Sequence, residues 1–277
     1  MADKNPEIVS QKLTERYTKK EQDKHTNKLV INSDKTHLLV MAGRGAIAAL
    51  RMEVQVKAGP DVIDQSTSEK LLGGKIHFTG RWNEMVKNGS SSIISQLAGR
   101  LNGLKKLQQA DFKSKLAVAT AVIQSKIQYL LPLYGGAPDY LMKAIQVQQL
   151  KAARFVCGYN SFYWSTHKLL KTCGWLSIKQ QEFYSSTLLA HKIVITSLPH
   201  NLWADIVQQH TVQTRAATQG QIRYSDNYRG ASEFSRSSFK YRAQRYYNRI
   251  PADFKRQSLE VFKSRLKSYT ARNIPIK

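Results

Sequence analysis

The chain has 277 residues, of which 42% are hydrophobic, so it is long enough to bury one large or two modest cores. Its 43 Lys and Arg against 19 Asp and Glu give a formal charge of +24, which favours nucleic acid as a partner over a merely basic surface. Two cysteines exclude a disulfide framework, and the lack of a signal peptide or a long apolar run predicts an intracellular protein, cytoplasmic or nuclear, neither secreted nor membrane-spanning.

The first 80 residues are predicted to form one helix and a small antiparallel sheet. Apolar side chains recur at helical spacing over about residues 6–26, at Ile8, Val9, Leu13 and Tyr17. The apolar runs 29–31 and 38–40 then flank the polar group Asn32-Ser33-Asp34-Lys35. This spacing is typical of two strands joined by a tight turn, because Asn and Asp accommodate turn conformations.

Two further segments complete the predicted sheet. Apolar residues at 54, 56, 62 and 63 lie on either side of the turn signal Gly59-Pro60-Asp61, which predicts a second hairpin. Segment 69–78 predicts one more strand. The pair Gly73-Gly74 inside that strand indicates a β-bulge or a close approach of another backbone.

Residues 81–160 have the pattern of a helical bundle. Apolar positions three and four residues apart predict two helices that pack as a hairpin and end near Pro132 and Gly135-Gly136. The positions are Ile93, Leu97, Leu101, Leu104 and Leu107, and then Leu116, Ile123, Ile127 and Leu130. A third helix is expected from Pro138 to Gly158, with Leu141, Ile145, Ala152 and Phe155 on one stripe.

Residues 161–277 are predicted to be helical and include the most basic third of the chain. Helices are expected over about 165–171 and 178–196. If residues 237–249 are helical, Arg242, Arg245 and Arg249 form a stripe beside an aromatic face. Two interpretations of this stripe are equally supported: the arginines contact phosphates, or they are only solvated.

Motifs of the common enzyme classes are absent from the sequence. There is no Gly-x-Ser-x-Gly, no phosphate-binding loop ending in Gly-Lys-Ser or Gly-Lys-Thr, and no His-Glu-x-x-His. Cys157, His167 and Cys173 are too few and too scattered for a zinc site, so the thiols are interpreted as buried structural side chains.

Several short motifs follow one another in a characteristic order. Asn32-x-x-Lys35-Thr36 precedes an apolar run, Glu69-Lys70-Leu71-Leu72-Gly73 comes next, and Trp82 opens a helix. Gln128-Tyr129 with Pro132-Leu133, Gly174-Trp175-Leu176, Thr214-Arg215 and the stretch from Phe239 to Pro251 follow in the later part. In this order the chain resembles, nearly end to end, the reverse transcriptases of non-LTR (LINE-type) retrotransposons, from the end of the palm onward.

The resemblance implies an α+β protein in three parts. Residues 1–80 would be a palm remnant with two hairpins, residues 81–160 a thumb-like helical bundle, and residues 161–277 a basic helical C-terminal region. Lys35 would lie near the incoming triphosphate and assist the leaving pyrophosphate. The segment from Lys70 to Gly73 matches the strand turn that grips the primer. Phosphate contacts of the thumb would come from Arg100, Lys105, Lys106, Lys113 and Lys115.

The carboxylates that hold two metal ions in such polymerases have no counterpart here. The sequence contains no Asp-Asp pair, and Asp61 and Asp64 are interpreted as turn residues beside Gly59-Pro60. We therefore expect the C-terminal part of an RNA-directed DNA polymerase whose N-terminal portion is missing. This part would bind RNA–DNA hybrid or RNA, hold no cofactor and be inactive alone, with Mg²⁺ expected only for the full-length polymerase.

Two alternatives to a polymerase fragment remain open at the level of the sequence. The chain is then either a reused module that binds RNA, DNA or a protein, or a translated transposon remnant without a function. A remnant with a truncated palm would expose apolar sheet edges and aggregate.

Overall fold

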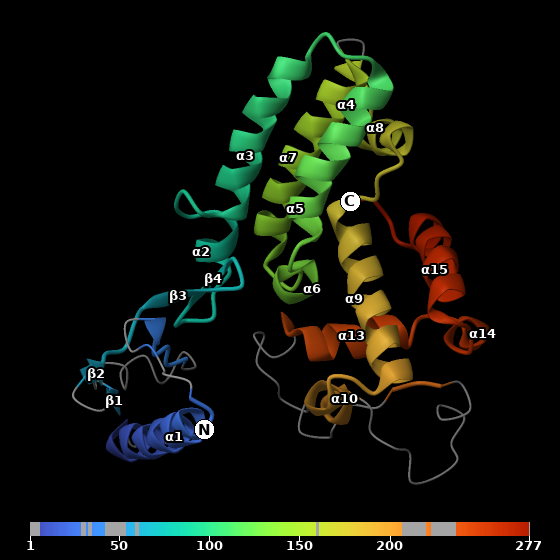
Figure 1. The fold of residues 1–277 in the computed structure, drawn as a ribbon. Coiled ribbons are helices and arrows are strands. Elements are labelled where there is room, and N and C mark those ends of the chain that lie inside the picture. Colours follow the sequence, from blue (N-terminus) through green and yellow to red (C-terminus); the bar gives the residue numbers. More distant parts are fainter. Residues whose placement is uncertain are drawn as a thin grey trace. The chain divides into compact units, whose positions relative to one another are not determined.

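The computed structural model describes residues 6–28, 32, 35–41, 54–58, 61–158, 161–206, 220–222 and 237–276. The chain divides into two compact units, Met1–Met85 and Val86–Lys277, which are described separately (Figure 1). The predicted α+β class is confirmed, because one helix and short antiparallel strands precede a mostly helical region. None of the described helices combines the length and the apolar character that a membrane span requires.

The first unit begins with helix α1 (Pro6–Thr26), which packs on a hairpin of strands β1 (Val56–Ala58) and β2 (Asp61–Ile63). The strands are antiparallel with Val56 opposite Ile63, so the predicted second hairpin is confirmed. Leu13 and Tyr17, one turn apart on α1, pack against the buried side chains of this hairpin. Two of the four predicted apolar positions of the helix thus contact the hairpin, whereas Ile8 is exposed.

The prediction of one strand over residues 69–78 is wrong. The segment forms a separate hairpin of strands β3 (Ser68–Leu71) and β4 (Gly74–His77). Its turn residues Leu72 and Gly73 both have positive φ, +48° and +79°. Two positive φ angles match a type I′ turn, whose twist suits two-residue hairpins. The glycine pair therefore marks the turn and the start of β4, and the β part consists of two sheets instead of one.

The predicted strand over residues 38–40 is likewise not formed. Leu38 makes an isolated parallel bridge with Gln65, and its carbonyl accepts from the Ser66 backbone N–H at 2.8 Å. Leu38 is thus paired in parallel with a segment 27 residues further along the chain. Residues 29–31, the other strand of that predicted hairpin, lie outside the described residues.

The second unit opens with a helical bundle. Helix α2 (Asn83–Val86) contains the boundary between the two units. The elements of the bundle are α3 (Ile93–Leu104), η4 (Lys105–Leu107), α4 (Phe112–Ala119), η5 (Thr120–Gln124), α5 (Ser125–Gln128), α6 (Leu131–Tyr134) and α7 (Asp139–Cys157). Ser92 and Asp111 cap the first turns of α3 and α4 by accepting backbone N–H bonds, which satisfies donors that the helices leave unpaired. The buried positions Leu97, Ile123 and Leu141 confirm the predicted apolar stripes.

Helices α4 and α5 form one rod that is interrupted by the π-helical turn η5. The buried side chain of Gln124, the last residue of η5, accepts from the amide groups of Gln149 on α7 and Gln181 on α9. These two amides also donate to the Leu176 carbonyl at 2.9 and 2.7 Å. A layer of glutamine hydrogen bonds thus joins three helices inside the bundle.

The rest of the second unit packs around one long helix. Its elements are α8 (Thr166–Cys173), α9 (Ile178–Thr196), α10 (His200–Ile206), α13 (Phe239–Tyr247), α14 (Ala252–Lys255) and α15 (Leu259–Asn273). Helix α9 contacts α6, α7, α13 and α15 (Figure 1). More than half of its residues are buried. Phe183, Tyr247 and Phe262 are fully buried side chains of this core. The predicted helices 165–171, 178–196 and 237–249 correspond to α8, α9 and α13.

Candidate nucleic-acid interface

The three predicted site residues of the first unit lie in turns or on an exposed strand. The Asn32 side chain accepts from the Lys35 backbone N–H at 3.2 Å, and the Lys35 side chain is exposed. Lys70 is exposed on β3 opposite Lys75 of β4. Gly73 occupies the left-handed position of the β3–β4 turn. The described geometry thus keeps these residues accessible, and their assigned polymerase roles stay predictions.

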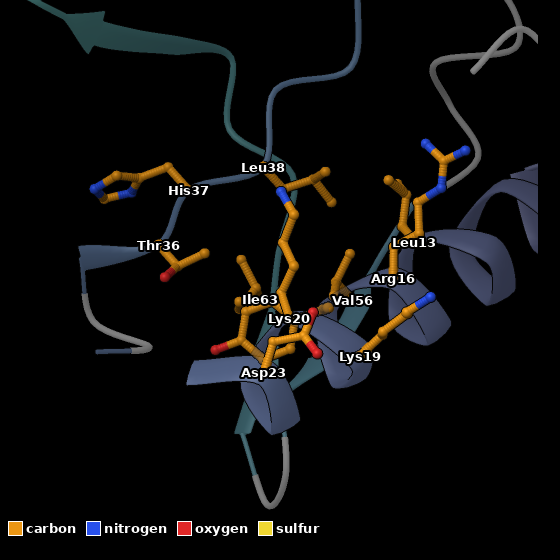
Figure 2. Close-up of a pocket in the computed structure, with 11 residues that line it drawn as sticks. Leu13, Arg16, Lys19, Lys20, Asp23, Thr36, His37, Leu38, Val56 and Ile63 are labelled. Atoms are coloured by element: carbon orange, nitrogen blue, oxygen red, sulfur yellow. The ribbon is translucent and has the colours of Figure 1, made fainter. Parts of the chain in front are cut away.

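A cavity of about 710 Å³ lies in the first unit between α1, the β1–β2 hairpin and residues 36–38 (Figure 2). Leu13, Val56 and Ile63 give it apolar walls, and the cations Arg16, Lys19 and Lys20 of α1 border it. Asp23 is the one acid among the residues that line it. A single carboxylate does not hold two divalent metal ions, so the cavity does not replace the absent polymerase carboxylates.

The predicted phosphate contacts of the thumb separate into exposed and engaged side chains. The Arg100 side chain is engaged within the protein, because its guanidinium donates to the Val122 carbonyl at 2.6 Å. Lys115 is half-buried with its ammonium 5.7 Å from the centre of the Phe155 ring. The other three lysines are exposed in the connection between α3 and α4 or at the start of α4, namely Lys105, Lys106 and Lys113.

The C-terminal end of α7, from which the chain continues to α8, lies at the same end of the bundle as the α3–α4 connection (Figure 1). The Lys115–Phe155 contact joins the start of α4 to the end of α7, in agreement with the ribbon. We call the described residues of these two connections, 105–113, 158 and 161–165, together with Lys168, the bundle tip. Lys168 of α8 places its ammonium 4.1 Å from the centre of the Trp164 ring.

The bundle tip is strongly positive because the sequence that forms it contains almost no acid. Asp111 and Asp139 are the acids that the sequence contains between residues 85 and 181. Asp111 caps α4, and hydrogen bonds from the side chain and backbone of Ser114 lower the pKa of its carboxyl. This carboxylate is bound to helix donors, so it does not pair with the lysines of the tip in the described geometry.

The two cysteines approach each other where α7 and α8 end, although they are 16 residues apart in sequence. The Sγ atoms of Cys157 and Cys173 are 3.7 Å apart, and burial raises the pKa of both thiols, that of Cys173 to about 12. His167 is exposed. Among the described residues, no three His, Cys, Asp or Glu side chains are grouped so that they could hold a metal ion.

The predicted C-terminal stripe of three arginines needs a correction. Arg242 is buried, forms an ion pair with Glu182 of α9 and donates to the Pro132 and Ser237 carbonyls at 2.6 and 3.0 Å. All of its donors point into the protein, so its assignment as a phosphate contact is wrong. Arg245 and Arg249 of the same stripe are exposed.

Glu182 is the centre of a buried polar cluster that sequence reasoning missed. The Tyr246 hydroxyl donates to its Oε2 at 2.7 Å and the Ser186 hydroxyl to its Oε1 at 3.3 Å. Burial raises the pKa of Glu182, and the Arg242 guanidinium opposes that shift. A lone acid on the buried face of a helix was the signal in the sequence, because such an acid requires a cationic partner elsewhere.

Comparison with known proteins returned no relative of this chain. No protein-family model matches it, and neither does any curated protein or any solved structure. What the site can do is therefore derived from its own residues and their charge.

Proposed function

We propose that this chain binds nucleic acid through the bundle tip, as the binding part of a protein related to non-LTR retrotransposon reverse transcriptases. The observation that carries the proposal is the group of exposed lysines in the α3–α4 connection and at the start of α4, namely Lys105, Lys106 and Lys113. Binding of a phosphate backbone to such a group releases condensed counterions, which is the main source of affinity for nucleic acid.

The charge of the whole chain supports the same partner. A formal charge of +24 repels itself in a compact protein, and a polyanion relieves that repulsion. The order of the sequence motifs points to RNA–DNA hybrid or RNA as the bound form. Because the chain lacks an Asp-Asp pair, we propose binding without nucleotide transfer by this chain alone.

The first test measures binding of a fluorescent RNA–DNA primer–template across a series of salt concentrations. The variant Lys105→Ala/Lys106→Ala/Lys113→Ala is expected to lower the slope of log affinity against log salt by about 2.7, because each lost phosphate contact removes about 0.9. Thermal unfolding should be unchanged, since the three side chains are exposed.

The matched control removes three exposed lysines elsewhere in the same unit, in the variant Lys143→Ala/Lys179→Ala/Lys192→Ala. Equal losses in both triple variants would show that affinity comes from diffuse charge and would contradict a site at the bundle tip. Primer extension by the chain in the presence of Mg²⁺ and nucleotides would contradict the proposal that the chain alone does not transfer nucleotides. An RNA of defined sequence that binds far more tightly than the hybrid would favour the reused module instead.

A further inference from the structure

Two aromatic rings in the α7–α8 connection are exposed to an unusual degree. The side chain of Phe162 is 67% exposed and that of Tyr163 is 92% exposed. The two rings meet edge to face, with centroids 5.2 Å apart and planes at 85°. Adjacent exposed rings of this kind mark interaction sites, because water is a poor solvent for their faces.

Hydrogen bonds form on both sides of these rings, at Ser161 and at Trp164. The buried Ser161 hydroxyl donates to the Gly158 carbonyl at 2.6 Å, and the Trp164 backbone N–H donates to the Ser161 carbonyl at 3.1 Å. Ser165 then caps α8 by accepting from the Lys168 backbone N–H at 3.3 Å. Hydrogen bonds beside the rings reduce the conformational entropy that this backbone loses when a ligand binds, which favours affinity.

Cations lie at the same end of the bundle as the rings. Lys168 covers one face of Trp164, next in sequence to Tyr163, and the lysines of the α3–α4 connection lie at the same end of the bundle. No Asp or Glu occurs between residues 140 and 181. A ligand for this surface therefore combines flat apolar faces with repeated negative charge, which is the chemistry of an unpaired nucleic acid strand.

We propose that Phe162 and Tyr163 form a stacking platform for the unpaired bases of a single-stranded nucleic acid, whose phosphates contact the lysines of the bundle tip. This inference rests on the proposed nucleic-acid binding and specifies the form of strand that the site takes. A duplex does not suit the platform, because its bases already stack on one another and offer no open face. RNA and DNA strands suit it equally, since the rings contact bases and not the 2′-hydroxyl.

The test compares a uridine-rich single strand with a duplex of the same length. The variant Phe162→Ala/Tyr163→Ala is expected to weaken single-strand binding by about tenfold for each ring and to leave duplex binding unchanged. The conservative variant Tyr163→Phe should retain single-strand binding. The matched control is Tyr140→Ala, which truncates an exposed aromatic residue at the other end of α7.

A spectroscopic readout separates stacking from charge. A strand that carries the fluorescent base 2-aminopurine should lose fluorescence on binding to the wild-type chain but not to the ring variant, because stacking quenches the base. Equal affinity of wild type and ring variant for the single strand would overturn the platform, and so would equal losses for single strand and duplex. If the triple lysine variant weakens binding and the ring variant does not, the proposed function is supported and the stacking platform is contradicted. If the wild-type chain binds no nucleic acid at low salt, both fall.

Discussion

The bundle tip and the polar core between α9 and α13 use basic side chains in opposite ways. In the core, Arg242 is surrounded by acceptors, namely Glu182 and the Pro132 and Ser237 carbonyls. At the tip, the exposed lysines have no comparable set of acceptors in the described structure, and Asp111 is occupied as a helix cap. The comparison teaches that a high count of cations predicts a partner only where the fold leaves those cations outside.

Removal of the buried arginine should give the largest effect on stability. Arg242→Ala is expected to lower the free energy of unfolding by about 3–5 kcal/mol, because Glu182 stays buried without its cation. Urea denaturation measures this loss. Arg245→Ala, an exposed change on the same helix, should stay within about 0.5 kcal/mol of wild type.

A double variant sharpens the same test. Glu182→Leu/Arg242→Met removes both charges, so it should be more stable than Arg242→Ala alone. Equal effects of Arg242→Ala and Arg245→Ala would erase the distinction between the two regions.

Crowding around the core should give the next largest effect. A Cβ at Gly136 would lie 1.9 Å from the Ser237 carbonyl oxygen, so Gly136→Ala must displace the backbone and is expected to cost about 2–3 kcal/mol. In α3, which leads to the tip, a Cβ at Gly99 meets nothing within 4 Å. Gly99→Ala should therefore gain about 0.5–1 kcal/mol in the same denaturation assay. A neutral result at Gly136 would indicate that the core adapts more freely than its geometry implies.

Acid should weaken the core before it affects the tip. His191 is buried, its ring centroid lies 3.7 Å from that of Phe262, and burial lowers the pKa of its imidazole. The unfolded state then binds the proton more readily, so this contribution to stability is complete above the ordinary His pKa of about 6.5 and is lost as the pH falls below it. Urea midpoints over a pH series should show this loss in the wild type and a flatter profile in His191→Gln. The exposed His167→Gln should follow the wild type.

The exposed part of the C-terminal stripe should give the smallest effect on stability. Arg245→Ala/Arg249→Ala is expected to change the free energy of unfolding by about 0.5 kcal/mol or less. The salt slope of primer–template binding should fall by about 1.8, from two phosphate contacts instead of the three in the predicted stripe. An unchanged slope would assign both arginines to the solvated surface and leave the bundle tip as the sole site.

Helical periodicity predicted several helices well, since the apolar positions of α1, α3 and α7 are spaced along the chain and need no knowledge of partners. Strand pairing was harder. Leu38 pairs with Gln65, and a local sequence pattern does not predict a partner 27 residues away. At Gly73, the glycine pair was compatible with both a bulge and a turn, and the left-handed conformation of Leu72 decided for the turn.

Contacts between residues far apart in the sequence also limited what the sequence revealed about the site. Arg242 and Glu182 are 60 residues apart, so the pattern on α13 alone gave Arg242 the same role as Arg245. The aromatic run 162–164 was visible directly after a predicted helix end, yet only the structure shows that Phe162 and Tyr163 remain exposed. Local patterns thus located the cations, while long-range packing decided which of them are accessible.

The π-helical turn at Thr120–Gln124 makes the bundle sensitive to chain length as well as to composition. A π turn amounts to one residue inserted into an α-helix, and one residue rotates the following helix by about 100°. Deletion of a single residue here would restore a regular α-helix and turn Ile127 away from the core in which it is now fully buried. Inserting or deleting one residue in this rod therefore differs from substituting one, because it rotates the helix that follows even where the side chains are unchanged.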